Sequence, residues 1–250
     1  MGFEDFGFWA AAITAAILVG MSKGGLPIVA MLSVPIMTLV INPVMAAGLL
    51  LPVYVVSDMF GLWAYRRDFD RLLLRILIPP CILGVAIGWA TATLVPERLV
   101  TGLIGLIGAA FALNLLLRHA QEGPPRKPRL GPGWFWGTVA GFTSFVSHSG
   151  GPPYQVYVLP LRLKKTVFAG TTTILFAIIN AVKLIPYYFL GQLSADNLHV
   201  ALLLMLPASL AVFAGVRLVR ILPEKLFFQI VTWALLAISL KLLWDAARGG

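Results

Sequence analysis

The chain has 250 residues, of which 59% are hydrophobic and only 12% are charged, and its mean hydropathy is +0.91. About a quarter of the residues in a typical soluble domain are charged, so this composition excludes a soluble domain. It also excludes a membrane β-barrel, because the apolar runs lack the alternation that barrel strands need. The net charge of +9 does not indicate nucleic-acid binding, since the basic residues cluster in short loops.

The chain opens with an apolar stretch, residues 7–41, which is interrupted by the sequence MSKGGLP. Paired glycines and a proline interrupt a helix. The stretch is therefore interpreted as a helical hairpin that enters the membrane and returns, or as two short tilted helices. Three uninterrupted spans follow, each near the ~20 residues that cross a bilayer. They lie near residues 45–65, 72–94 and 97–117.

A polar linker rich in proline and glycine, residues 119–133, comes next. The second interrupted stretch, residues 134–161, is broken at SHSGGPP, which leaves roughly 14 residues on each side. That length is short for a full crossing, so the same two interpretations apply. Three more spans lie near residues 166–189, 197–219 and 225–244.

The lysines and arginines lie mostly in alternate loops, and this bias orients the chain. Loops 65–75, 162–165 and 217–225, together with residues 118–133, hold 14 of the 19. The opposite side, with both termini, holds three: Arg98, Lys241 and Arg248. We predict a multi-pass protein of the cell (inner) membrane with a cytoplasmic linker and external termini. This orientation requires each interrupted stretch to return to the side on which it began.

Three short sequences recur in the same order, which predicts an internal duplication. KGGLP at 23–27 matches SGGPP at 149–153, MAAG at 45–48 matches VFAG at 167–170, and LVPERLV at 94–100 matches ILPEKLF at 221–227. The halves, residues 7–118 and 134–245, each combine one interrupted stretch with three crossings. Because three crossings take the chain to the opposite side of the membrane, the second half is inverted relative to the first. The predicted fold is an all-α polytopic membrane protein of two inverted repeats, each a broken or re-entrant hairpin plus three transmembrane helices. Such repeats with discontinuous helices are typical of transporters.

A resemblance to a known family extends over nearly the whole chain, from Phe8 to Trp244. It is carried by GMSKGGLPIVAMLSVPI (20–36), GFTSFVSHSGGPPYQVYVLPL (141–161) and FAGTTTILFAIINAVKLIPY (168–187). At these residues the chain resembles the sulfite exporter TauE/SafE family of membrane permeases. The resemblance implies transport of small sulfur-containing anions, such as sulfite, thiosulfate or organosulfonates, coupled to an ion gradient. The chain departs from the commoner pattern of three or more clustered glycines, since Lys23 precedes one glycine pair and His148–Ser149 the other.

Candidate substrate-binding residues come from the two breaks and from one polar helix face. Their hydroxyl and charged groups, with the N–H groups after each glycine pair, would replace the water shell of an oxyanion. The candidates are Ser22, Lys23, Gly24, Gly25, Ser147, His148, Ser149, Gly150, Gly151, Gln155, Thr173, Asn180 and Lys183.

Two lysines lie within apolar stretches, Lys23 at the first break and Lys183 inside span 166–189. An ionisable residue within a span is a functional hypothesis by default, because its burial is costly unless it is paired. The alternative for each lysine is a stem that snorkels to the membrane interface. Asn180 and Thr173 share the helix face of Lys183, which favours a polar, cavity-facing stripe.

Asp58 is the only acidic residue well inside a span, and it occupies the repeat position of Asn180, 122 residues later. It is interpreted either as a structural ion-pair partner of Lys23 or Lys183, or as the site that couples transport to a proton or cation. Two neighbours are near enough in sequence to hydrogen-bond it: Tyr54 and Ser57. His148 is the second coupling candidate, because the usual pKa of histidine lies near physiological pH. A neutral buried histidine is the alternative there.

The competing function classes are an intramembrane enzyme and a permease for other cargo. No catalytic motif is present, so we predict no enzyme, no cofactor and no resident metal. A cation or metal permease would need Asp, Glu, His or Met ligands, whereas two lysines against one aspartate favour an anion. That permease, and one for another small anion such as a carboxylate, remain the alternatives. The expected partners are a small anionic substrate, the lipid bilayer and a proton or cation as co-substrate, with no nucleic acid.

Overall fold

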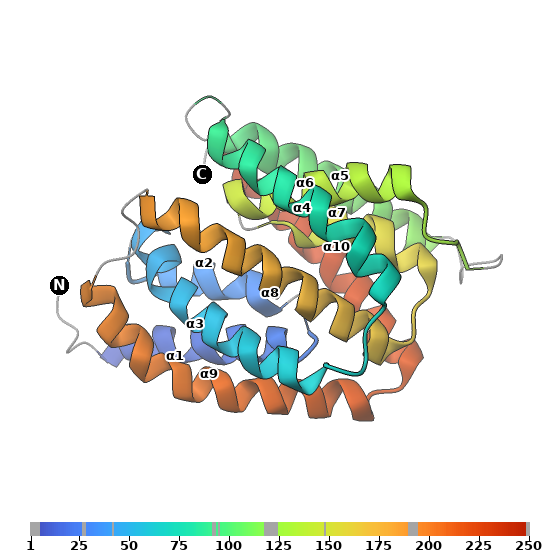
Figure 1. Ribbon diagram of the computed structural model, residues 1–250. Helices are drawn as coiled ribbons and strands as arrows, with labels where there is room; N and C mark the ends of the chain where they lie inside the picture. Colours follow the sequence, from blue (N-terminus) through green and yellow to red (C-terminus); the bar gives the residue numbers. More distant parts are fainter. Residues whose placement is uncertain are drawn as a thin grey trace. The chain divides into compact units, whose positions relative to one another are not determined.

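The computed structural model describes residues 6–26, 29–41, 43–91, 94, 96–117, 125–147, 149–189 and 195–248. Throughout these residues the regular structure is helical (Figure 1), which confirms the predicted all-α class. Six helices of the described segments are long and apolar enough to cross a membrane. The composition therefore gives the fold that a bilayer permits, in which each helix satisfies its own backbone hydrogen bonds.

The uninterrupted spans form helices where the hydropathy predicted them. They are α3 (Pro43–Ala64), α4 (Arg71–Ala90), α5 (Glu97–Leu117), α8 (Lys165–Phe189), α9 (Ala195–Ile221) and α10 (Glu224–Arg248). The start of α4 shows how sequence sets such a boundary. The Asp70 carboxylate accepts a hydrogen bond from the Leu73 N–H at 3.0 Å, which caps the helix directly after the basic loop.

The first interrupted stretch forms a hairpin. It consists of α1 (Phe6–Lys23), the 3₁₀ helix η1 (Val29–Leu32) and α2 (Ser33–Thr38). Phe8 near the start of α1 and Met37 near the end of α2 belong to one hydrophobic cluster. The chain therefore returns to the side on which α1 began, as Figure 1 shows for these helices.

The second interrupted stretch also returns to its starting side. It consists of α6 (Leu130–Ser147), α7 (Gly151–Val158) and the 3₁₀ helix η2 (Leu159–Leu161). The Arg126 N–H donates to the Pro160 carbonyl at 3.1 Å, and the Tyr157 hydroxyl donates to the Arg129 carbonyl at 3.0 Å. These bonds join the entry of α6 to the end of the return arm, so the stretch is a hairpin and not a pair of crossing helices.

The two arms of the second hairpin are unequal, which differs from the prediction of about 14 residues on each side. α6 has 18 residues and α7 has 8. α6 begins at Leu130, inside the predicted linker, and takes Gly131 and Pro132 into its first turn. Proline is tolerated there because the N–H groups of the first turn have no partner within the helix.

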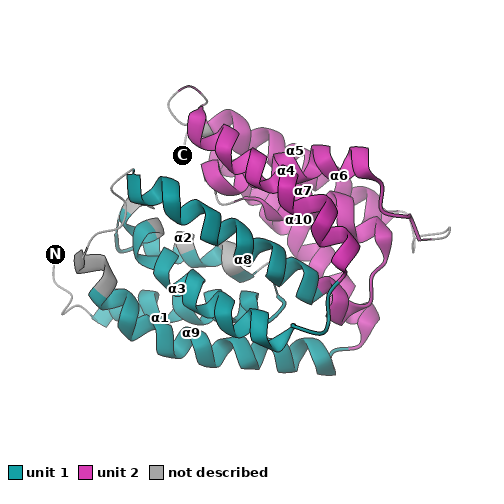
Figure 2. Ribbon diagram, in the orientation of Figure 1, with its two compact units in different colours: residues 1–69, 169–222 teal, residues 70–168, 223–250 magenta. Residues whose placement is uncertain are grey.

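The chain divides into two compact units (Figure 2). One comprises residues 1–69 and 169–222, and the other residues 70–168 and 223–250. In the first unit α9 packs along α1 and α3, and in the second α4 packs along α6 and α5 along α10. Each unit combines segments of both predicted halves, so the halves are not compact bodies, and the internal repeat stays a prediction.

Candidate functional site

Charged and polar side chains from three helices meet inside the first unit. Lys23 is the last residue of α1, Asp58 lies near the end of α3, and Asn180 and Lys183 are one turn apart in α8. Their relative exposures are 6%, 3%, 8% and 1%. We call these four residues the charged cluster. Its charges are removed from water, so each needs a partner within the protein.

The Asp58 carboxylate is the centre of the charged cluster. The Lys23 ammonium lies 2.8 Å from its Oδ1, and the Asn180 Nδ2 donates to its Oδ2 at 2.8 Å. Lys183 is close enough to interact electrostatically with both Lys23 and Asp58. A buried ion pair is tolerated only when hydrogen bonds satisfy its remaining polar atoms, and Asn180 supplies one such bond.

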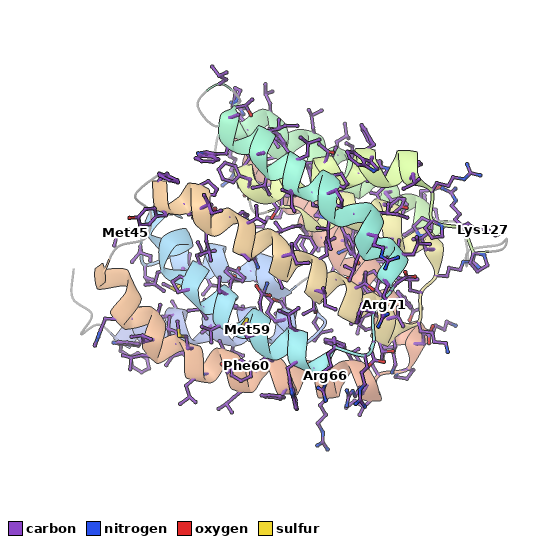
Figure 3. The ribbon with its side chains drawn as sticks, viewed as in Figure 1. Met45, Met59, Phe60, Arg66, Arg71 and Lys127 are labelled. Carbon is purple, nitrogen blue, oxygen red and sulfur yellow. The ribbon has the colours of Figure 1, made fainter. Side chains whose placement is uncertain are left out.

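Both lysines of the cluster lie inside the protein, so the snorkelling alternative is wrong for each. A snorkelling ammonium reaches water at the end of an extended stem. The Lys23 ammonium is instead 5.0 Å from the centre of the Tyr54 ring, and that of Lys183 is 5.8 Å from the centre of the Tyr187 ring. By contrast Arg66, labelled in Figure 3 after the end of α3, is exposed, and its guanidinium stacks on the Trp63 ring, 4.7 Å from the ring centre.

The glycine pair of the first break ends α1. The N–H groups of Gly25 and Leu26 donate to the carbonyls of Ser22 and Met21, at 3.1 and 3.4 Å, and Gly25 has φ of +102°. This is the Schellman motif, in which glycine adopts the left-handed conformation after a helix. Both N–H groups are used by the cap, so the expectation that they bind an anion is wrong.

Side-chain hydroxyl groups hold the backbone of this break. Thr173 donates to the Lys23 carbonyl at 3.2 Å, and Tyr65 donates to the Gly24 carbonyl at 2.6 Å. The Ser22 hydroxyl donates to a carbonyl one turn back in α1 at 2.6 Å. The break is therefore a fixed support for the Lys23 side chain, at the helix end where the macrodipole favours a cation.

The glycine pair of the second break has the opposite role, because it begins a helix. Gly150 is the N-cap of α7 and Gly151 is its first residue. Pro152 and Pro153 follow, and neither has an N–H group. Two of the donors that a helix N-terminus normally offers to an anion are thus missing.

The polar residues of the second break lie in the second unit and are described by themselves. Ser149 is buried, and its N–H and carbonyl groups both hydrogen-bond to Thr143, at 3.1 and 3.2 Å. Gln155 is also buried, and its Oε1 has no hydrogen-bond partner among the described residues. His148 and the side chain of Ser147 lie outside the described residues.

The comparisons with known proteins bear on what this arrangement does. A family model described as sulfite exporter TauE/SafE matches residues 10–242, nearly the whole chain. The chain belongs to the TauE/SafE family. This TauE/SafE protein is therefore a multi-pass membrane protein of a transporter family, as its apolar helices also indicate. The searches of curated proteins and of solved structures found no match.

Some candidate residues of this TauE/SafE protein come together, and others make different contacts from those expected. Apart from the charged cluster, Thr173 is the predicted site residue that joins the first break. The Tyr54 hydroxyl, expected near Asp58, lies 2.7 Å from Ser33 Oγ. The Ser57 hydroxyl has no hydrogen-bond partner in the described part of the chain.

Sequence reasoning did not select three residues that contact the site: Ser33, Tyr65 and Tyr187. Tyr187 follows Lys183 by one helical turn, a spacing that places two side chains on one face and that was available in the sequence. Ser33 and Tyr65 contact residues that are 21 and 41 positions away in the sequence, and only the fold reveals these contacts. Within the described residues, no group of three His, Cys, Asp or Glu side chains could hold a metal ion.

Proposed function

We propose that this protein is a secondary transporter of small sulfur-containing anions, of the sulfite, thiosulfate or organosulfonate class. The observation that carries the proposal is a pair of buried lysines around one buried carboxylate within membrane helices. Lys23 and Lys183 outnumber Asp58, so the charged cluster has a positive excess that an anion neutralises. Its amide and ammonium groups supply the hydrogen-bond donors that an oxyanion needs.

Transport by this site requires alternating access at the interface of two inverted repeats. The charged cluster is buried, so an anion reaches it only after helices move. Support for the repeats comes from two re-entrant hairpins separated by three crossings. Asp58 and Asn180 add to this support, because they occupy predicted equivalent positions and hydrogen-bond to one another across 122 residues. Equivalent residues meet in this way near a twofold axis.

The transport is coupled to an ion gradient through Asp58. An anion that engages Lys23 draws the ammonium away from the carboxylate, which then binds a proton more readily. Proton and anion binding thereby favour each other, and this linkage is reciprocal. His148 is the second coupling candidate.

Purified protein in liposomes tests the proposal. Uptake of sulfite, thiosulfate, methanesulfonate and acetate compares the sulfur anions with a carboxylate. Lys23→Met or Lys183→Met keeps the stem but removes the charge. Anion affinity should fall by roughly ten- to a hundredfold in at least one variant, the equivalent of losing about 1.5–3 kcal/mol for a charge-assisted hydrogen bond.

The matched control is Lys241→Met, which removes an exposed lysine that pairs with Asp245 in α10. It should leave affinity unchanged. If both buried-lysine variants remain folded and bind anions as the wild type does, the charged cluster is not the anion site.

A further inference from the structure

The charge of the buried cluster limits the charge of its cargo. When both lysines are protonated and Asp58 is ionised, the cluster carries two positive charges and one negative charge, and all three side chains are buried. A bound monoanion makes this group neutral, whereas a dianion leaves one uncompensated negative charge. Water cannot screen that charge in a closed, buried site, so the imbalance disfavours binding.

One proton removes the imbalance. Protonation of Asp58 raises the net charge of the cluster by one, so that a dianion is then matched. We propose that this site binds singly charged anions directly and binds doubly charged anions only together with one proton on Asp58. The inference rests on the proposed function and restricts its coupling step to doubly charged cargo: thiosulfate is carried with one proton on Asp58, and an organosulfonate with none.

The surroundings of Asp58 support its selection as the group that takes the proton. The charged or titratable side chains that face it come from α1, α8 and its own helix: Lys23, Lys183 and Tyr54. α2 contributes Ser33, which lies against the Tyr54 hydroxyl. α9 also packs on α3, and there it places Phe213 edge-to-face on Phe60. The bases of α9, Arg217 and Arg220, lie in its last two turns. Asp58 is therefore the acid of the cluster.

The bond between Asp58 and Asn180 provides a matched control. Asp58→Asn removes the negative charge with little change in size. The double variant Asp58→Asn/Asn180→Asp returns one carboxylate to the cluster on the other side of the same hydrogen bond. If net charge selects the cargo, the double variant should behave like the wild type. If Asp58 acts only as the local partner of Lys23, the double variant should differ from the wild type.

Two probes of fixed charge test the proposal. Methanesulfonate carries one negative charge and thiosulfate carries two throughout the neutral pH range, whereas sulfite changes its charge there. Binding to the purified full-length protein and uptake into liposomes are measured with each probe, with and without a pH gradient. In the wild type, thiosulfate affinity and uptake should rise as the pH falls, and methanesulfonate should not respond.

In Asp58→Asn, the preference should move toward thiosulfate by about tenfold or more, and the response of thiosulfate to pH should disappear. The double variant should restore the wild-type preference between the two probes and the response of thiosulfate to pH. The proposal is overturned if Asp58→Asn leaves the ratio of the two affinities unchanged, or if the double variant keeps the altered ratio. A wild type that binds both probes with no pH response also overturns it, although the anion-transport proposal then stands. A wild type that binds neither probe overturns both.

Discussion

The two glycine breaks have similar sequences but opposite structural roles. KGGLP ends the long helix α1 and carries Lys23 into a cluster of buried charges. SGGPP begins the short helix α7 and presents two prolines where a helix usually presents N–H groups. A glycine pair thus indicates where a helix is interrupted but not which end of a helix is formed there. That distinction decides the chemistry, because a helix C-terminus favours a cation and an N-terminus favours an anion.

The comparison also shows where the binding groups come from. At the first break the backbone donors are used in the helix cap, so positive charge is supplied by side chains. At the second break the described polar groups are uncharged. A model in which both breaks bind the anion through backbone N–H groups therefore does not fit this chain.

The largest difference between the breaks should appear on substitution of one glycine in each. In Gly25→Ala, the new Cβ would lie 2.4 Å from the Tyr65 hydroxyl, at a backbone φ of +102°. The strain should destabilise the protein by about 1–3 kcal/mol. In Gly151→Ala, the new Cβ meets only the Gln155 amide, at 4.0 Å, and stability should hardly change. Thermal unfolding in detergent measures both, and equal losses would contradict the different roles of the two glycines.

A smaller difference is expected for the tyrosines that hold the hairpins. Tyr65→Phe leaves the buried Gly24 carbonyl without its bond, at a cost of about 1 kcal/mol or more. Tyr157→Phe removes a bond to the carbonyl of Arg129, an exposed residue at the entry of α6, where water can replace the hydroxyl. Its unfolding temperature should fall less. A larger loss in Tyr157→Phe would show that the second hairpin is the more tightly held.

The smallest effect is expected in the linker. A protease site inserted between residues 121 and 122 should leave transport unchanged and be cut from the cytoplasmic side, as the charge map predicts. The same insertion between residues 127 and 128 separates Arg126, which bonds to the return arm, from the start of α6, and should lower stability. Cleavage of the first insertion from the outside would reverse the predicted orientation.

Much of the fold could be predicted because the bilayer leaves few alternatives. Span lengths follow from its thickness, and the two helical breaks follow from glycine and proline. The start of α6 was missed, because Gly131 and Pro132 look like linker residues although both fit the first turn of a helix. The prediction of two arms of equal length rests on the same error.

The charged cluster was predictable because charges within apolar spans are rare. Lys23, Asp58 and Lys183 were selected as charged residues within apolar stretches, and Asn180 was selected because it shares the helix face of Lys183. The cap at Gly25 could also have been found, since a lysine in the last turn, a glycine and then an apolar residue are typical of a Schellman motif. The contacts of Ser33 with Tyr54 and of Tyr65 with Gly24 could not, because they depend on how separate helices approach each other.

The Asp58–Asn180 hydrogen bond has a consequence for the ancestry of the chain. If the halves arose by gene duplication, their ancestor was one short polypeptide that paired with an identical copy, and the same residue stood on both sides of this bond. Two aspartates there would repel, while two asparagines would carry no charge. A single carboxylate facing an amide could arise only after the gene was duplicated and the two copies were free to diverge. Gene duplication would thus have been a precondition for placing a single acid between Lys23 and Asn180.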